Sequence, residues 1–160
     1  MSEQTEPRTL SLEVLVPLLE EQLSLGREVR FTAYGTSMLP LLHNSDVILI
    51  PPPERLKKGD LPFYRRRSGQ YVLHRVIGIN RDGSYVLCGD NQHEHETPIF
   101  HDQIIGVVRT FFRDGAAVSV EDPRVKRYVR RLPLRRLWLR YRGMTPKRFW
   151  NGLRRRLRRK

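Results

Sequence analysis

The fold of this chain is decided by residues 71–88, which read YVLHRVIGINRDGSYVLC. Two runs rich in Val, Ile, Leu and Tyr, residues 71–79 and 85–88, flank the polar segment Asn-Arg-Asp-Gly at 80–83. Apolar and β-branched runs separated by a short glycine-containing segment are typical of two antiparallel strands joined by a hairpin loop. The stretch therefore predicts antiparallel β-structure.

The same pattern of short apolar runs separated by turn residues continues on both sides of this hairpin. Further strands are predicted at residues 29–34, 46–50, 60–66, 104–112 and 117–120. The segments between them contain Pro and Gly, as in Lys58-Gly59 and Asp114-Gly115. Many short strands with such loops favour a mainly β fold of coiled antiparallel sheets, barrel-like in outline.

Helical patterns occupy the two ends of the chain. Residues 1–27 hold a short amphipathic helix near 9–25, with Leu12, Leu15, Leu19 and Leu23 on one face. Residues 28–122 form the β domain, and residues 123–160 form a basic amphipathic helical tail. The apolar and capping residues of this tail are Leu132, Leu134, Leu137, Trp138, Tyr141, Thr145, Pro146, Phe149, Trp150, Leu153 and Leu157.

Charge is distributed unevenly along the 160 residues. Residues 1–122 carry 13 Lys and Arg against 17 Asp and Glu, whereas residues 123–160 carry 17 Lys and Arg and no acidic residue. Arginines interleaved with aromatic residues on a helix suit an anionic membrane surface, so residues 124–160 are expected to meet one. Nucleic acid would attract the same charges, and a solvated or protein-docking tail is the third interpretation.

No apolar run approaches the ~18 residues needed to span a bilayer, and the first six residues are acidic rather than basic. The single cysteine, Cys88, cannot form an internal disulfide, which fits a reduced compartment. The sequence therefore predicts a cytoplasmic or peripheral membrane protein.

Three short segments supply the groups of a serine hydrolase in the order Ser, His, Asp. Ser37 lies in Gly-Thr-Ser-Met-Leu-Pro at 35–40, His74 lies in the predicted strand 71–79, and Asp90 lies in Gly-Asp-Asn at 89–91. A serine hydroxyl becomes a good nucleophile when a neighbouring base removes its proton and a third group orients that base.

These segments, Gly-x-Ser-Met-x-Pro, then His-Arg-Val-Ile-Gly, then Gly-Asp-Asn, resemble the type I signal peptidase superfamily, which also contains the self-cleaving repressors. His74 stands where most bacterial members have lysine, so the chain is similar to the branch that uses histidine as the base. The resemblance covers roughly residues 28–120. It implies a serine endopeptidase that cleaves leader or signal-like peptides, takes a peptide or precursor protein as substrate, and needs no cofactor.

The resemblance leaves the residue that orients His74 open. Asp90 matches the Gly-Asp-Asn of the family, and Glu96 or Glu94 lies where the histidine branch can place its carboxylate. Asp90 could instead fix its own turn by accepting backbone hydrogen bonds. A Ser–His dyad without a third residue is the remaining alternative.

The oxyanion site departs from the family pattern, because Gly35 stands where signal peptidases often carry a serine. The backbone N–H of Ser37 is the expected donor, with the Thr36 hydroxyl as a weaker candidate. A substrate peptide is expected to add as a strand along residues 29–34. The expected substrate contacts are Phe31, Ala33, Gly35 and Met38.

Three histidines and two glutamates between residues 93 and 101 resemble a metal cluster, but the region reads as a loop, and no metal site is predicted there. A non-catalytic module that binds nucleic acid or an anionic membrane through its basic tail is the alternative function. A relative that has lost activity and acts as a scaffold is a third.

Overall fold

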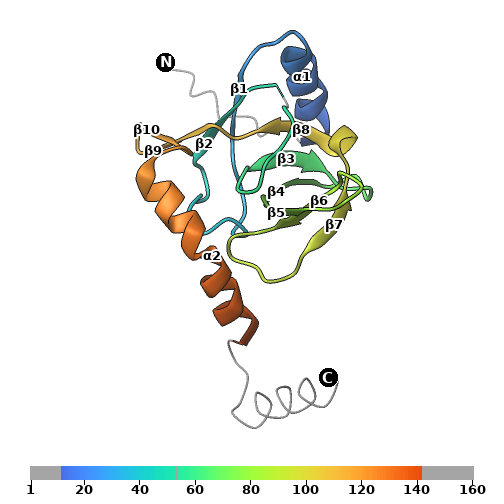
Figure 1. Cartoon of the computed structure of the whole chain (residues 1–160). Coiled ribbons are helices and arrows are strands. Elements are labelled where there is room, and N and C mark those ends of the chain that lie inside the picture. The colour runs from blue at the N-terminus through green and yellow to red at the C-terminus, as the bar shows by residue number, and fades with distance from the viewer. Residues whose placement is uncertain (1–11, 53, 142–160) are drawn as a thin grey trace.

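The computed structural model describes residues 12–52 and 54–141 (Figure 1). Its helices are α1 (Leu12–Ser24) and α2 (Pro123–Tyr141), and one turn of 3-10 helix, η1, spans His101–Gln103. The strands are β1 (Val29–Thr32), β2 (Val47–Ile50), β3 (Pro62–Arg65), β4 (Tyr71–Leu73), β5 (Arg75–Ile79), β6 (Tyr85–Cys88), β7 (Glu96–Ile99), β8 (Ile104–Val107), β9 (Thr110–Arg113) and β10 (Ala116–Ser119). The predicted mainly β class is confirmed, with a helix before the strands and another after them.

The strands form three antiparallel sheets, with the orders β1-β2-β9-β10, β4-β3-β8 and β5-β6-β7. These sheets remain separate and do not close into a barrel, so the barrel-like outline expected from the sequence is not seen. β1 and β4 each have one neighbour and therefore stand at sheet edges.

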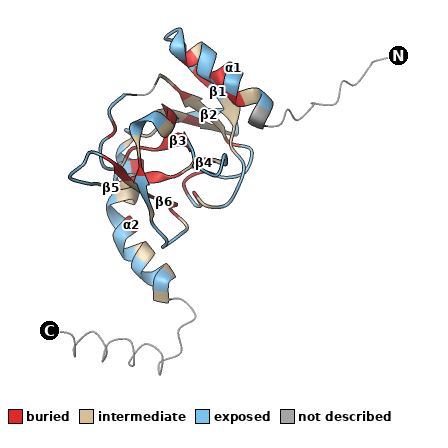
Figure 2. Cartoon of the chain, turned by 90° about the vertical axis from the view of Figure 1, so that its right-hand side faces the viewer, coloured by how far each residue is buried: buried red, intermediate tan, exposed pale blue. Residues whose placement is uncertain are grey.

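Two apolar clusters fill the interior (Figure 2). The larger one packs one face of α1, through Val16, Leu19 and Leu23, against the sheet that contains β1. The smaller one lies between the other two sheets and includes the fully buried Tyr64 and Leu87. Since the large cluster also takes in Met38, Leu41 and Leu42, the turn that carries Ser37 is anchored in the core.

Two segments that were each predicted as one strand are divided into two strands in the structure. Residues 71–79 divide at His74 into β4 and β5, and residues 104–112 divide at Val108 and Arg109 into β8 and β9. In both cases the chain leaves one sheet and enters another. Continuous apolar character favours one long strand, but an apolar strand can also bend at a corner and pass from one sheet to another.

Helix α2 begins at Pro123, where the sequence predicts the basic tail, and lies on the other side of the body from α1 (Figure 1). Its Val125 and Leu132 are buried, so its inner face belongs to the body. The part of the predicted helical tail that follows Tyr141 lies outside the described residues. Within the described residues, neither helix combines the length and the apolar character needed to cross a membrane.

Candidate active site

Ser37 begins a tight turn that follows β1. The Leu39 N–H donates to the Thr36 carbonyl at 3.3 Å and the Leu42 N–H donates to the Met38 carbonyl at 3.0 Å. Met38 is buried, whereas Ser37 is half-buried at the surface of a cavity. The apolar residues after the serine thus fix the turn and leave the hydroxyl accessible.

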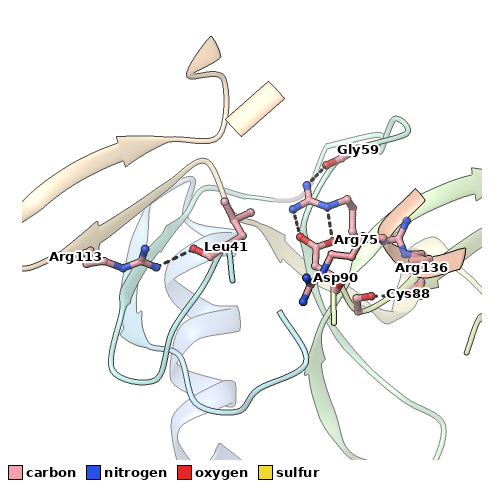
Figure 3. Close-up of polar contacts among 9 residues, drawn as sticks. Leu41, Gly59, Arg75, Cys88, Asp90, Arg113 and Arg136 are labelled. Atoms are coloured by element: carbon pink, nitrogen blue, oxygen red, sulfur yellow. Dashed lines mark hydrogen bonds and ion pairs between the residues drawn. The ribbon is translucent and has the colours of Figure 1, made fainter. Parts of the chain in front are cut away.

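The far side of this turn is held by polar contacts. Asn44 Oδ1 accepts from the Gly35 N–H at 2.7 Å. Arg113 donates to the Leu41 carbonyl at 2.8 Å (Figure 3). Gly35 has a φ of 112°, a backbone conformation that favours glycine. A serine at this position would be strained, so the glycine follows from the shape of the turn.

The Gly89–Asn91 turn packs against the Ser37 turn from the other side and donates hydrogen bonds to it. The Asn91 N–H donates to the Ser37 carbonyl at 2.8 Å, and Asn91 Nδ2 donates to the Thr36 carbonyl at 3.3 Å. A Cβ on Gly89 would lie 2.8 Å from the Ser37 carbonyl oxygen, closer than real contacts allow. Gly89 and Asn91 therefore hold the backbone of Ser37.

His74 stands at the corner between β4 and β5, and its side chain is almost wholly buried. Its Nδ1 lies 2.9 Å from Glu96 Oε1 and 3.4 Å from the hydroxyl of Tyr64. Glu96 reaches this position because β7 pairs with β6, with Glu96 opposite Leu87. Since a carboxylate beside Nδ1 favours a proton on that nitrogen, the neutral imidazole keeps Nε2 free to act as a base.

Burial lowers the pKa of His74, and the positive charge of Arg66 lowers it further, while the Glu96 carboxylate works in the opposite direction. The net effect is a pKa below the usual value of 6.5. A neutral imidazole near pH 7 is the form that can remove a proton from a serine hydroxyl.

Glu96 is also bound by Arg66, whose Nε donates to Glu96 Oε2 at 2.8 Å and whose Nη2 donates to Oε1. Burial raises the pKa of Glu96, but the hydrogen bonds from Arg66 and Tyr64 outweigh it and hold the pKa below its usual value. The carboxylate that faces His74 therefore stays ionised.

Asp90 has different partners. Its carboxylate is fully buried and accepts two hydrogen bonds from Arg75, from Nε at 2.8 Å and from Nη2 at 2.6 Å, while Arg75 also donates to the Gly59 carbonyl (Figure 3). The first choice for the residue that orients His74 is thus placed against Arg75, and the alternative, Glu96, contacts the imidazole. Glu94 is exposed in the loop before β7.

Ser37 and His74 line the same cavity, of about 320 Å³. The four expected substrate contacts, Phe31, Ala33, Gly35 and Met38, also line it, together with Tyr71 and Leu73 of β4. Thr36 is not part of the lining. In the described structure no hydrogen bond joins the two side chains, a separation that substrate binding often closes in hydrolases.

The Ser37 N–H points to no protein acceptor among the described residues. It is therefore a free backbone donor next to the Ser37 hydroxyl. The Thr36 carbonyl, which shares a peptide plane with this N–H, accepts from the Leu39 N–H and from Asn91 Nδ2, which fixes the direction of the plane.

The described residues hold no group of three or more His, Cys, Asp or Glu side chains that could bind a metal ion. Of the residues considered for such a site, Glu96 is engaged by Arg66 and His74, and His101 lies 3.3 Å from the hydroxyl of Tyr85.

Sequence reasoning missed Tyr64 and Arg66. Arg66 is one of three consecutive arginines, and nothing in the sequence sets it apart from its neighbours. Tyr64 occupies an ordinary strand position whose pairing with β8 and β4 can be seen only in the fold. Comparison of the chain with protein-family models, with curated proteins and with solved structures finds no match.

Proposed function

We propose that this protein is a serine endopeptidase in which Ser37 is the nucleophile, His74 is the general base and Glu96 orients the imidazole. The observation that carries the proposal is the position of His74, which is buried in the wall of the cavity that Ser37 also lines and has its Nδ1 2.9 Å from Glu96 Oε1. The resemblance to signal peptidases in the residues around Ser37, His74 and Gly89 supports the same assignment.

The reaction would follow acyl transfer. His74 Nε2 takes the proton of Ser37 Oγ as the oxygen attacks the scissile carbonyl, and the imidazolium is stabilised by Glu96. The imidazolium then gives the proton to the leaving amine, which leaves an acyl-enzyme on Ser37. His74 next removes a proton from a water molecule that attacks the acyl-enzyme. The imidazolium returns this proton to Ser37 Oγ as the acid leaves, which restores the free serine and the neutral imidazole.

The tetrahedral intermediate needs donors for its oxyanion, and the Ser37 N–H is the one we propose. Gly35 supplies no hydroxyl at the position where signal peptidases often carry one. Since the loss of one such donor typically costs about 10²–10³ in rate, turnover is expected to be slow.

The substrate we propose is an extended leader or signal-like peptide. β1 and β4 are edge strands of different sheets, and Phe31 of β1 and Tyr71 of β4 both line the cavity. Exposed main-chain groups at two edges can bind a peptide strand lying between them, and the apolar cavity can receive one of its side chains.

A library of peptides with varied sequences, read by mass spectrometry, tests this function and defines the cleavage site in one experiment. Wild-type protein is expected to cleave a subset of the peptides at a common site. Ser37→Ala and His74→Ala are each expected to reduce cleavage on the order of 10³-fold or more, while Ser68→Ala, in the exposed β3–β4 turn, leaves it unchanged. Cleavage by Ser37→Ala at the wild-type rate would refute the proposal.

A second property is favoured by the outer face of α2, which we define as Arg127, Arg130, Arg131, Leu134 and Leu137. All five are exposed or partly exposed, with Leu134 and Leu137 at 72% and 54%. Adjacent cationic and apolar groups on one helix face suit an anionic membrane, where each arginine contributes about 1 kcal/mol and the leucines enter the interface.

Flotation with vesicles tests this surface. The protein is expected to bind vesicles of phosphatidylcholine and phosphatidylglycerol more strongly than vesicles of phosphatidylcholine alone. The double variant Leu134→Ser with Leu137→Ser should bind them less. Salt-sensitive binding to duplex DNA that this double variant retains, with no preference for anionic vesicles, would instead favour nucleic acid as the partner.

A further inference from the structure

Two arginines of α2 bind the turn that holds Ser37. Arg135 donates from Nε to the Asp90 carbonyl at 3.3 Å and from Nη2 to Asn91 Oδ1 at 2.9 Å. Arg136 lies 3.4 Å from the buried Asp90 carboxylate, through Nη2, and its side chain is only 12% exposed. These two side chains face the body, away from the exposed cationic face of the same helix.

The hydrogen bond from Arg135 fixes the orientation of the Asn91 side-chain amide. Because Asn91 Oδ1 accepts from Arg135, its Nδ2 is left to donate to the Thr36 carbonyl. The backbone N–H of the same residue donates to the Ser37 carbonyl. Asn91 is thus a bridge with α2 on one side and the two residues of the Ser37 turn on the other.

The contact of Arg136 with Asp90 stabilises the same Gly89–Asn91 turn. Asp90 is bonded to Arg75, the residue that follows His74, and lies between Gly89 and Asn91 in the chain. Arg136 adds a second cation to this carboxylate. Movement of α2 would therefore disturb the backbone on both sides of the cavity, at Ser37 and at His74.

We propose that Arg135 and Arg136 are positioning residues that make α2 part of the scaffold of the active site, a role that rests on the proposed peptidase function. A nucleophile must be held within about 0.5 Å of its productive position, and an error of about 1 Å costs about 100-fold in rate. Among the described residues, the hydrogen bond that fixes the Ser37 carbonyl comes from the Asn91 N–H, and Arg135 orients Asn91.

The two arginines are expected to differ when replaced by lysine. Arg135 uses two nitrogens for two acceptors, so a single ammonium can restore one contact, and Arg135→Lys is expected to rescue only part of the lost rate. Arg136 makes one charged contact, so Arg136→Lys is expected to restore most of it. A loss due only to general destabilisation would not follow this order.

The experiment measures kcat and KM on a peptide that the wild type cleaves, together with amide hydrogen exchange by NMR. Arg135→Ala and Arg136→Ala are expected to lower kcat by about 10- to 100-fold, with KM within about threefold of the wild type. The Asn91 amide is expected to exchange at least about tenfold faster in Arg135→Ala. Arg81→Ala, in the exposed β5–β6 turn, is the control for the loss of a surface arginine.

Three outcomes would overturn the proposal. One is kcat and Asn91 exchange in both alanine variants equal to those of Arg81→Ala. Another is an equal rise in exchange at Asn91 and at the buried Val108, whose N–H donates to the Leu61 carbonyl inside the body, because that indicates global loosening. The third is full rescue by both lysine variants or by neither. If the wild type cleaves no peptide, the peptidase function fails, and the Asn91 exchange in Arg135→Ala still decides whether α2 holds the turn.

Discussion

His74 is surrounded by charges of both signs, and the pH dependence of cleavage should report their balance. Burial, together with Arg66, lowers the pKa of the imidazole below 6.5. A base works in its neutral form, so activity is present above this lowered pKa and is lost as the pH falls through it. We expect the acidic limb of the kcat/KM profile below pH 6.5; a midpoint well above that value would contradict the assignment of His74 as the base.

The two charged neighbours of His74 should move this limb in opposite directions. Glu96→Gln removes a negative charge that raises the pKa of His74, so the limb should shift to lower pH, and kcat should fall on the order of 10²–10⁴-fold because the imidazole loses its orientation. Arg66→Gln removes a positive charge that lowers the pKa, so the limb should shift upward. Shifts of the same sign in both variants would argue against direct electrostatic contact with His74.

Substitutions of Asp90 and Glu96 should differ in how much they lower the free energy of unfolding. Asp90→Asn leaves Arg75 buried without its full counter-charge, so the free energy of unfolding should fall by about 3–5 kcal/mol. Glu96→Gln breaks a pair whose Arg66 side chain is 34% exposed, so solvent screening keeps the loss near 1 kcal/mol or less. Denaturant titration measures both. Equal losses would mean that Glu96 is as structural as Asp90.

At the level of the strands, the sequence predicts most of the sheet positions and misses the corners. β6 has the predicted ends, and β2 and β10 agree with their predicted ends within one residue. The divisions at His74 and at Val108 were missed because an apolar run gives no sign of the point where a strand passes from one sheet to another. The division at His74 matters most, since the corner is what turns the imidazole toward the cavity.

β7 explains why the candidate site was predicted only in part. Ser37 and His74 are recognisable from their flanking residues, whereas Glu96 begins a strand that contains Thr97 and Pro98, and proline argues against a strand. Only the pairing of β7 with β6 brings Glu96 to the start of β5. Such a contact depends on sheet register, which local sequence patterns do not contain.

The Gly89 turn lies so close to the Ser37 turn that the addition of one methyl group, in Gly89→Ala, should disturb both. In Gly89→Ala the new Cβ would meet the Ser37 carbonyl oxygen at 2.8 Å and Gln92 Oε1 at 2.7 Å, so the Ser37 turn must shift. We expect a loss of about 1–3 kcal/mol in unfolding free energy and a lower kcat. Gly78→Ala is the matched control, because its Cβ meets Val86 at an ordinary 3.6 Å. Wild-type kcat in Gly89→Ala would show that the turn has room to move.

At the scale of the whole molecule, the arginines of α2 lie on two different faces of the helix. Arg135 and Arg136 face the Gly89–Asn91 turn, while Arg127, Arg130 and Arg131 lie on its outer face. The chain region that composition marks as a basic tail therefore begins with a helix that belongs to the folded body. Its attachment to that body should be measurable independently of any activity.

Leu132 and Leu134 measure that attachment, since they lie two residues apart on α2 and differ sharply in burial. Leu132 is 1% exposed beside β5, in a group that includes Val76 and Arg136, whereas Leu134 is 72% exposed. Leu132→Ala should lower the free energy of unfolding by about 2–4 kcal/mol through lost burial and the cavity left behind, and Leu134→Ala by at most about 0.5 kcal/mol. Both values come from denaturant titration in the absence of vesicles. Equal small losses would mean that α2 adds little to the stability of the fold, and its arginines could then not hold the Ser37 turn. A large loss in Leu132→Ala alone would mean that the packing of α2 stabilises the body that carries the Ser37 turn.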